Sequence, residues 1–258
     1  MKKLVFLLLT FFLCINAFSQ QLAINDSEKV LSNSEKDFIE NAVAYEIKFY
    51  NQIFPQDTFL LTDVSFNIFK KYEQYLAYQA HVKGSAHYRS LGYYSFTEKE
   101  IVVCKEKQPQ GQFLKTCSHE LSHFLLMQRM NTPIWLNEGL ATYFGNMKFS
   151  SKNATHDKNK YMIARIKTMI DLRDIDLPDF VTWDHEKFGK MSFSNDNYGY
   201  AISYGIIFFL MNKNEDLTMN IIREIGKNQS TADAFDTCYT GGFAQFEKDF
   251  IVYYSNSK

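Results

Sequence analysis

A chain of 258 residues that is 46% hydrophobic and 16% aromatic has enough apolar side chains to form a sizeable core. Its 28 basic and 29 acidic side chains give a formal net charge of -1. No basic field therefore argues for nucleic-acid binding, and no long acidic run indicates a disordered tail. The function has to be argued from a site.

The first 19 residues predict a signal peptide. Lys2 and Lys3 form a basic start, residues 4–15 are nearly all apolar, and residues 17–19 place small side chains at a cleavable spacing. An uncleaved anchor helix is the alternative, but this apolar stretch is shorter than the roughly 20 residues needed to cross a bilayer. We expect a mature chain from Gln20, secreted or periplasmic, with no membrane anchor.

The next part of the chain predicts a mixed α/β region. An amphipathic helix is expected from Ser34, as N-cap, to about Gln52, followed by a strand at 64–69 and a helix at 70–80. Residues 92–105 predict a β-hairpin. Its second strand is either an ordinary sheet strand or the edge on which an extended peptide substrate lies.

A helix predicted from Gln112 to about Arg129 carries the pattern H-E-x-x-H. Because residues four apart share one helix face, His119 and His123 can direct nitrogens to a single Zn²⁺. Glu120 can then reach a water molecule and accept its proton. Two histidines hold zinc poorly, so a third ligand is required.

Glu138 is the candidate for that third ligand. Pro133 ends the first helix, a second begins near Trp135, and Glu138 lies 15 positions after His123. A short turn between two helices brings the second back against the first. The alternative is that an acid in the first turn only compensates the helix dipole. Cys117 lies on the far side of the first helix and is expected to be a small buried residue.

Two segments carry a resemblance to a known family. HELSH at 119–123 and WLNEGLATYF at 135–144 resemble the gluzincin metallopeptidases, in particular the peptidase MA-like group, which is distantly similar to thermolysin and aminopeptidase N. The resemblance implies that Glu120 is the general base and acid and that zinc polarises the substrate carbonyl. The zinc ligands that it implies, for one ion per chain, are His119, His123 and Glu138.

The resemblance also assigns an oxyanion donor. Tyr200 starts the apolar stretch YAISYGIIFFL, in the place where aminopeptidase-like members have such a tyrosine. A phenol stays protonated at neutral pH and can donate to the developing charge. Tyr204 is the next candidate, and Tyr198 is also near. Thr142 departs from the family pattern, because several relatives have an acid there that supports a ligand histidine.

The fold that the resemblance implies is an α+β, zincin-like catalytic domain over residues 20–258. Residues 20–145 would form an N-terminal mixed α/β lobe with a small sheet and the active-site helix. Residues 146–258 would form a mainly helical C-terminal lobe.

The sequence therefore predicts a zinc-dependent peptidase that hydrolyses peptide or protein substrates. No G-x-M-E-N segment is present to hold a free amino terminus, which favours an endopeptidase. One alternative is a catalytically inactive zincin-like protein that binds peptides or cell-envelope material. Another is an accidental motif, which would require His119 and His123 to point apart or Glu138 to lie far from them.

Overall fold

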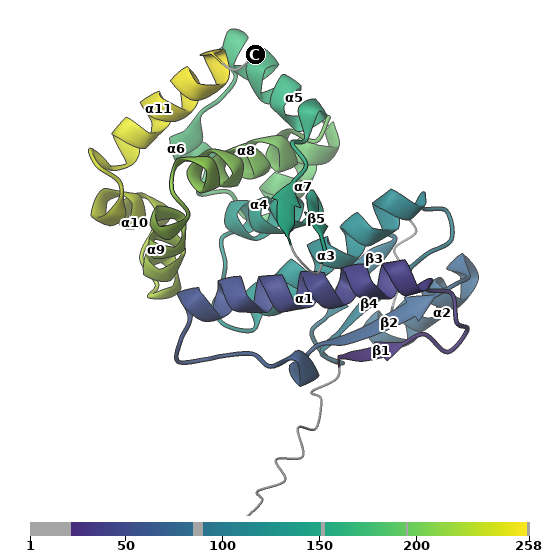
Figure 1. Cartoon of the computed structure of the whole chain (residues 1–258). Coiled ribbons are helices and arrows are strands. Elements are labelled where there is room, and N and C mark those ends of the chain that lie inside the picture. Colours follow the sequence, from purple (N-terminus) through teal and green to yellow (C-terminus); the bar gives the residue numbers. More distant parts are fainter. Residues whose placement is uncertain (1–21, 85–89, 151–152, 195, 257–258) are drawn as a thin grey trace, which may run out of the picture.

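The computed structural model describes residues 22–84, 90–150, 153–194 and 196–256, so the predicted signal peptide lies outside the described residues. Within them the chain is an α+β structure with mostly helical content and a small mixed sheet (Figure 1). The elements in chain order are β1 (Ala23–Asn25), α1 (Asn33–Ile53), the 3-10 helix η1 (Leu61–Asp63), β2 (Ser65–Phe69), α2 (Tyr72–Lys83), β3 (Gly92–Ser95), β4 (Glu100–Cys104), α3 (Gln110–Met127), α4 (Ile134–Gly145), β5 (Met147–Phe149), β6 (Ala154–His156), α5 (Lys160–Asp171), α6 (Leu177–Phe180), α7 (His185–Ser194), α8 (Tyr198–Lys213), α9 (Glu215–Gly226), α10 (Thr231–Cys238) and α11 (Gly242–Asn256).

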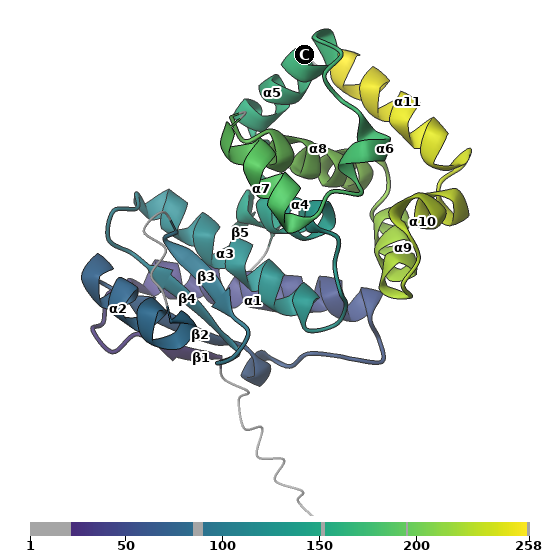
Figure 2. The same ribbon diagram turned by 180° about the vertical axis from the view of Figure 1, so that it is seen from behind.

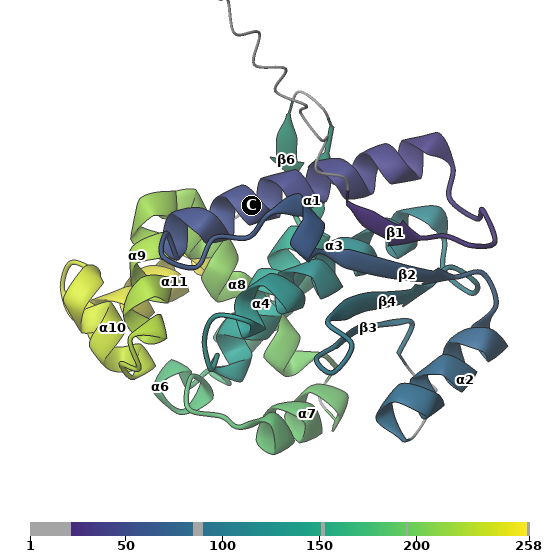
Figure 3. The same cartoon turned by 90° about the horizontal axis from the view of Figure 1, so that it is seen from below.

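The larger sheet has the strand order β1-β2-β4-β3, as Figure 3 shows. The predicted hairpin is confirmed, because β3 and β4 pair antiparallel with Tyr93 opposite Val102. Of the two alternatives for the second hairpin strand, the ordinary sheet strand is confirmed and the free edge is wrong, because β4 also pairs with β2 in parallel and Val102 lies opposite Asn67. Of the two hairpin strands, the one at an edge of the sheet is the first, β3, which lies beside α3 in Figure 2.

The two faces of this sheet are covered by different helices, because successive side chains of a strand point to opposite faces. Ile101 and Val103 of β4 belong to the large core that includes α1 and α3. Val102 and Cys104 instead pack with Tyr75 of α2. The sheet is therefore buried on both sides, and α3 is held firmly against one of them.

Helix α1 begins earlier than the sequence analysis predicts. The N-cap is Ser32 rather than Ser34: the Ser32 hydroxyl accepts from the Glu35 backbone N–H at 3.3 Å, and the Glu35 carboxylate accepts from the Ser32 backbone N–H at 2.7 Å. This reciprocal pair needs a Glu or Gln three residues after the cap. Ser34 has the shorter Asp37 at that position.

Three short strands were not predicted. β1 lies in the polar segment before α1 and pairs with β2, while β5 and β6 form a small antiparallel sheet after α4. Each has only three residues. A segment of that length contains too few alternations to stand out as a period of two.

The hydrophobic core runs without interruption through both halves of the described chain, from Leu31 before α1 to Tyr254 in α11. Helix α4 packs against α3 on one side and α8 on the other, so it links the sheet-bearing half to the helices in the upper part of Figure 1. None of the described helices combines the length and the apolar character that crossing a membrane requires.

One carboxyl group is fully buried between α1 and α3. Glu46 is 0% exposed, and its Oε1 accepts from the Ser118 hydroxyl at 2.6 Å. Among the described residues its Oε2 has no hydrogen-bond partner. Burial raises the pKa of Glu46 well above its usual range, because removal from water penalises the charged form.

We expect Glu46→Gln to make the free energy of unfolding less dependent on pH. A carboxyl whose folded pKa is raised stabilises the protein at pH values below its unfolded pKa. That contribution is lost, by up to about 1.4 kcal/mol per pH unit, as the pH rises towards the folded pKa. Gln cannot ionise but keeps an oxygen for Ser118. Urea unfolding at several pH values from 4 to 8 should show the variant gaining stability relative to the wild type as the pH rises.

The matched control is Glu40→Gln, an exposed position on the same helix. Its stability difference from the wild type should stay nearly constant across this pH range. A constant difference for Glu46→Gln as well would show that Glu46 titrates in the folded protein as it does in the unfolded chain.

Candidate metal centre

Helix α3 has one buried face and one face open to the site. Cys117 is almost completely buried in the core, as expected for the side away from the histidines, and Leu121 is buried with it. His119 and His123 lie four residues apart on the other face, which is only partly buried. The helix thus anchors itself with apolar side chains and presents its imidazoles outward.

Two glycines let α4 come close to its neighbours. A Cβ at Gly139 would lie 2.7 Å from the carbonyl oxygen of Ser203 in α8, and a Cβ at Gly145 would lie 3.1 Å from the carbonyl oxygen of Lys115 in α3. Such distances are too short for any larger residue without movement of the backbone. Trp135 fixes the start of α4 by donating from Nε1 to the Thr231 hydroxyl at 3.1 Å. Glu138 is therefore carried by a helix wedged between α3 and α8.

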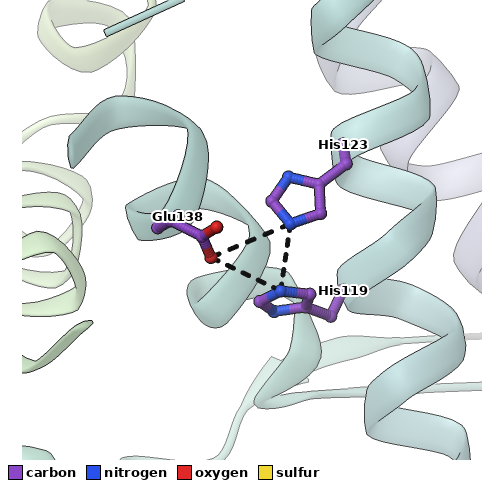
Figure 4. Close-up of side chains that lie close together, drawn as sticks. All are labelled: His119, His123 and Glu138. Carbon is purple, nitrogen blue, oxygen red and sulfur yellow. Dashed lines mark hydrogen bonds and ion pairs between the residues drawn. The ribbon is translucent and has the colours of Figure 1, made fainter. Parts of the chain in front are cut away.

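The three predicted ligand residues come together, as Figure 4 shows. His119 Nε2 and His123 Nε2 lie 3.1 Å apart, and Glu138 Oε2 lies 3.6 Å from the first and 3.8 Å from the second. Their ligating atoms all lie within 4.8 Å of one another. This group can hold a metal ion. The conditions for an accidental motif, diverging histidines or a distant glutamate, are not met.

Each histidine is oriented by a hydrogen bond to a group of α4. Asn137 Oδ1 lies 2.9 Å from His123 Nδ1 and, as a carbonyl oxygen, accepts from it. The backbone carbonyl of Ala141 accepts from His119. These partners leave Nε2 of His123 facing the site with a lone pair, which is the form that binds a metal. At the position of Thr142 several relatives have an acid that supports a ligand histidine. In this chain the Asn137 amide and the Ala141 backbone carbonyl support the histidines instead.

Burial controls the charge of the ligand side chains. It holds the pKa of His119 well below its usual range, with the neighbouring His123 adding to the effect, so the His119 imidazole is neutral. Burial also raises the pKa of Glu138 to about 8. Glu138 Oε2 has no hydrogen-bond partner among the described residues and is aimed between the imidazoles. A cation at this point would supply the missing partner.

Glu120 lies beside this group and against the edge strand β3. Burial raises its pKa to about 7 and the Glu138 carboxyl adds to the increase, while the Tyr94 backbone N–H acts in the opposite direction by donating to Glu120. A Cβ at Gly92 would lie 3.2 Å from Glu120 Cγ and 2.5 Å from Thr116 Cγ2. Gly92 therefore permits the edge strand to pass directly over the carboxyl.

The three tyrosines at the start of α8 have different surroundings. The pKa of Tyr200 is raised mainly by the charge of the Glu138 carboxyl, then by burial and by the charge of Glu120. Tyr204 instead accepts from the Asn159 backbone N–H at 3.0 Å. Tyr198 donates to the Asp174 carbonyl. Of the three, Tyr200 is the one whose pKa responds to the charges of Glu138 and Glu120, while the other two hydroxyls are bonded to backbone groups.

A cavity of about 460 Å³ opens next to the three candidate ligands and is lined by His119 and Glu120 together with residues of β3, α3, α4 and the start of α5. Sequence reasoning missed its contributors Gly92 and Lys115. It also missed Asn137. Because Asn137 directly precedes Glu138 in the sequence, its amide could have been proposed as a hydrogen-bond partner of a nearby histidine.

One family model matches the part of the chain that carries this site. No curated protein matches the chain. Residues 114–232 match the model of a family described as "Protein of unknown function (DUF1570)". This segment begins in α3, ends in α10, and contains the three ligand residues, Glu120 and Tyr200. The chain is thus similar over these residues to a family whose description assigns no activity.

Proposed function

We propose that the protein is an exported, zinc-dependent peptidase of the gluzincin type. The observation that carries the proposal is the convergence of two imidazole nitrogens and one buried carboxylate oxygen that lacks a hydrogen-bond partner among the described residues. Export is supported by the signal-like pattern of residues 1–19. Peptide substrates are supported by the resemblance of HELSH and WLNEGLATYF to gluzincins.

The ligand group fits a tetrahedral zinc ion. Two ligands bound at 2.0–2.1 Å in tetrahedral geometry lie about 3.3 Å apart, and the observed separations are 3.1, 3.6 and 3.8 Å. Two histidines and a carboxylate also serve Fe(II) in oxygenases. A second carboxyl beside the ligands, Glu120, favours zinc, because hydrolysis needs a base next to the metal whereas oxygen chemistry does not.

Bound zinc would supply Lewis acidity, which makes water acidic near neutral pH and withdraws electrons from a substrate carbonyl. Glu120 would accept a proton from the attacking water and return it to the departing amine. Because an adjacent cation favours the ionised form of a carboxyl, Glu120 and Glu138 are both expected to be charged in that state. The Tyr200 hydroxyl would donate to the oxyanion that forms on the former carbonyl oxygen.

The first test is the metal content of the mature protein from Gln20, purified without chelators. We expect close to one zinc and no stoichiometric iron per chain, and we expect Glu138→Gln to reduce zinc retention during dialysis. The Gln side chain keeps the size of Glu138 but loses the negative charge. Folding of both proteins is checked by circular dichroism. Well-folded wild-type protein that takes up no zinc on reconstitution would contradict the proposal.

The second test is hydrolysis of a broad library of internally quenched peptides by the zinc-loaded protein. Cleavage that stops when zinc is chelated and returns on its readdition supports the peptidase. Zinc at one per chain without cleavage of any library member would instead favour the inactive, peptide-binding alternative.

A further inference from the structure

The cavity beside the metal centre is polar and has a cation at its rim. Lys115 lies one helical turn before His119 on α3, so it shares the helix face of the ligands. Among the lining residues, Lys115 carries the positive charge and Glu120 the negative one. Apart from the His119 imidazole, the other polar side chains of the lining are hydroxyls and carboxamides: Ser90, Gln108, Gln112, Thr116, Thr142, Asn146 and Asn159.

Lys115 is held in place by neutral groups. Its Nζ donates to Asn146 Oδ1 at 3.1 Å, and Asn159 Nδ2 lies 3.4 Å from the same oxygen. Asn146 is buried, and its own Nδ2 donates to the Thr142 carbonyl at 2.8 Å, which fixes the direction of its amide. The ammonium group is therefore positioned by a rigid amide and keeps two N–H donors for other partners.

Lys115 has no carboxylate within 4 Å in the part of the chain that the structure describes. The nearby Asp157 feels its charge but is paired with Lys148 at 3.2 Å. The Lys115 ammonium group is half-buried beside a cavity and has no counter-ion among these residues. It attracts a carboxylate more strongly than a fully solvated ammonium group does, because water screens it less.

The opposite end of the same helix face is different. Met127, one turn after His123, is 40% exposed and borders a smaller cavity of about 330 Å³ together with the exposed Phe96. The polar residues that line this second cavity are Asn131, Thr132, Asn137 and His185, so it has no lysine or arginine in its lining, whereas the cavity beside His119 has Lys115. A charged group of a bound peptide is favoured on one side of the metal only.

We propose that the cavity beside His119 binds a carboxylate group of the substrate through Lys115. The inference rests on the proposed peptidase function and adds a substrate class to it. Four residues of helix rise about 6 Å, which equals about two residues of extended peptide. The carboxylate therefore belongs to one of the two residues next to the scissile bond on that side. It comes either from an acidic side chain or from the free C-terminus of the peptide.

The test uses zinc-loaded protein and quenched peptides that carry Glu or Gln at each of two positions on either side of one cleavage site. A second series compares a free C-terminal carboxylate with a C-terminal amide, one and two residues after the cleavage site. We expect kcat/KM to favour the carboxylate about tenfold or more, on one side only, as a charge-assisted hydrogen bond would. Preference for Glu in amidated peptides identifies the side chain as the source. Preference confined to the free acid identifies the terminus.

The variants Lys115→Gln and Lys115→Arg show whether Lys115 carries the preference. Lys115→Gln should reduce the ratio of kcat/KM values to near one by slowing cleavage of the carboxylate peptide. Lys115→Arg should keep most of the preference. The control Lys36→Gln removes the same charge from the exposed surface of α1 and should leave the ratio unchanged. Active wild-type protein with no carboxylate preference at any position would overturn the inference.

A binding measurement separates failure of this inference from failure of the proposed function. The zinc-loaded Glu120→Gln protein is titrated with the Glu and Gln peptides, with and without Lys115→Gln. If no peptide is ever cleaved, tighter binding of the Glu peptide that disappears with Lys115→Gln supports the carboxylate site while contradicting the peptidase. Equal binding of both peptides would overturn the site.

Discussion

Replacing Glu120 with Gln is expected to lower kcat for peptide hydrolysis by about 10²–10⁴-fold while leaving zinc content and folding unchanged. Proton transfer by a positioned side chain contributes about that factor. Gln has the same shape but cannot accept a proton from water. Glu120 is not one of the three residues whose ligand atoms converge, so its replacement should not release the metal.

The measurement is kcat on one quenched peptide, with zinc content and circular dichroism determined on the same preparations. Glu98→Gln is the matched control, because Glu98 is exposed in the turn between β3 and β4. It should retain wild-type activity. A Glu120→Gln protein that keeps more than a tenth of the wild-type kcat would show that another group accepts the proton.

Replacing Tyr200 with Phe is expected to lower kcat by about 10²–10³-fold, with a small change in KM. Loss of one donor to a developing oxyanion typically has this effect, because the interaction is made in the transition state rather than with bound substrate. The Tyr200 ring packs edge-on against Phe188 at 5.2 Å between centroids. Phe preserves that contact, so the stability of the protein should change little.

Tyr204→Phe is the discriminating control. The Tyr204 hydroxyl accepts from the Asn159 backbone N–H at 3.0 Å, and its side chain is completely buried. Leaving that N–H without its partner should cost about 1–3 kcal/mol of unfolding free energy, while kcat falls far less than in Tyr200→Phe. If Tyr204→Phe instead gave the larger fall in kcat at unchanged stability, the assignment of the two tyrosines would be reversed.

The local parts of the fold were predictable because their signals lie within a few residues. The hairpin at 92–105 has two short apolar runs on either side of a polar turn, and α3 and α4 follow from apolar spacing and from Pro133 between them. The N-cap of α1 was misplaced at Ser34, although the Ser32–Glu35 pair was visible in the sequence.

Local sequence signals do not show which of the two hairpin strands, β3 or β4, lies at an edge of the sheet. Both hairpin strands are short and largely buried, and their patterns do not differ in a way that reveals a second pairing partner. Only the parallel pairing of β4 with β2, from residues far earlier in the chain, makes β3 the edge. That pairing is a long-range contact and leaves no local periodicity.

The sequence by itself determined the chemistry of the candidate site: two histidines one turn apart, a carboxylate between them, and a second glutamate on the helix that follows. Helical geometry alone requires His119 and His123 to share a face. The tertiary structure decided the rest, because packing of distant helices selects among equivalent residue types. It engages the Tyr204 hydroxyl with the Asn159 backbone and leaves Tyr200 under the influence of the Glu138 and Glu120 charges. It also gives His123 the support of Asn137 and places Lys115 at the rim of the cavity.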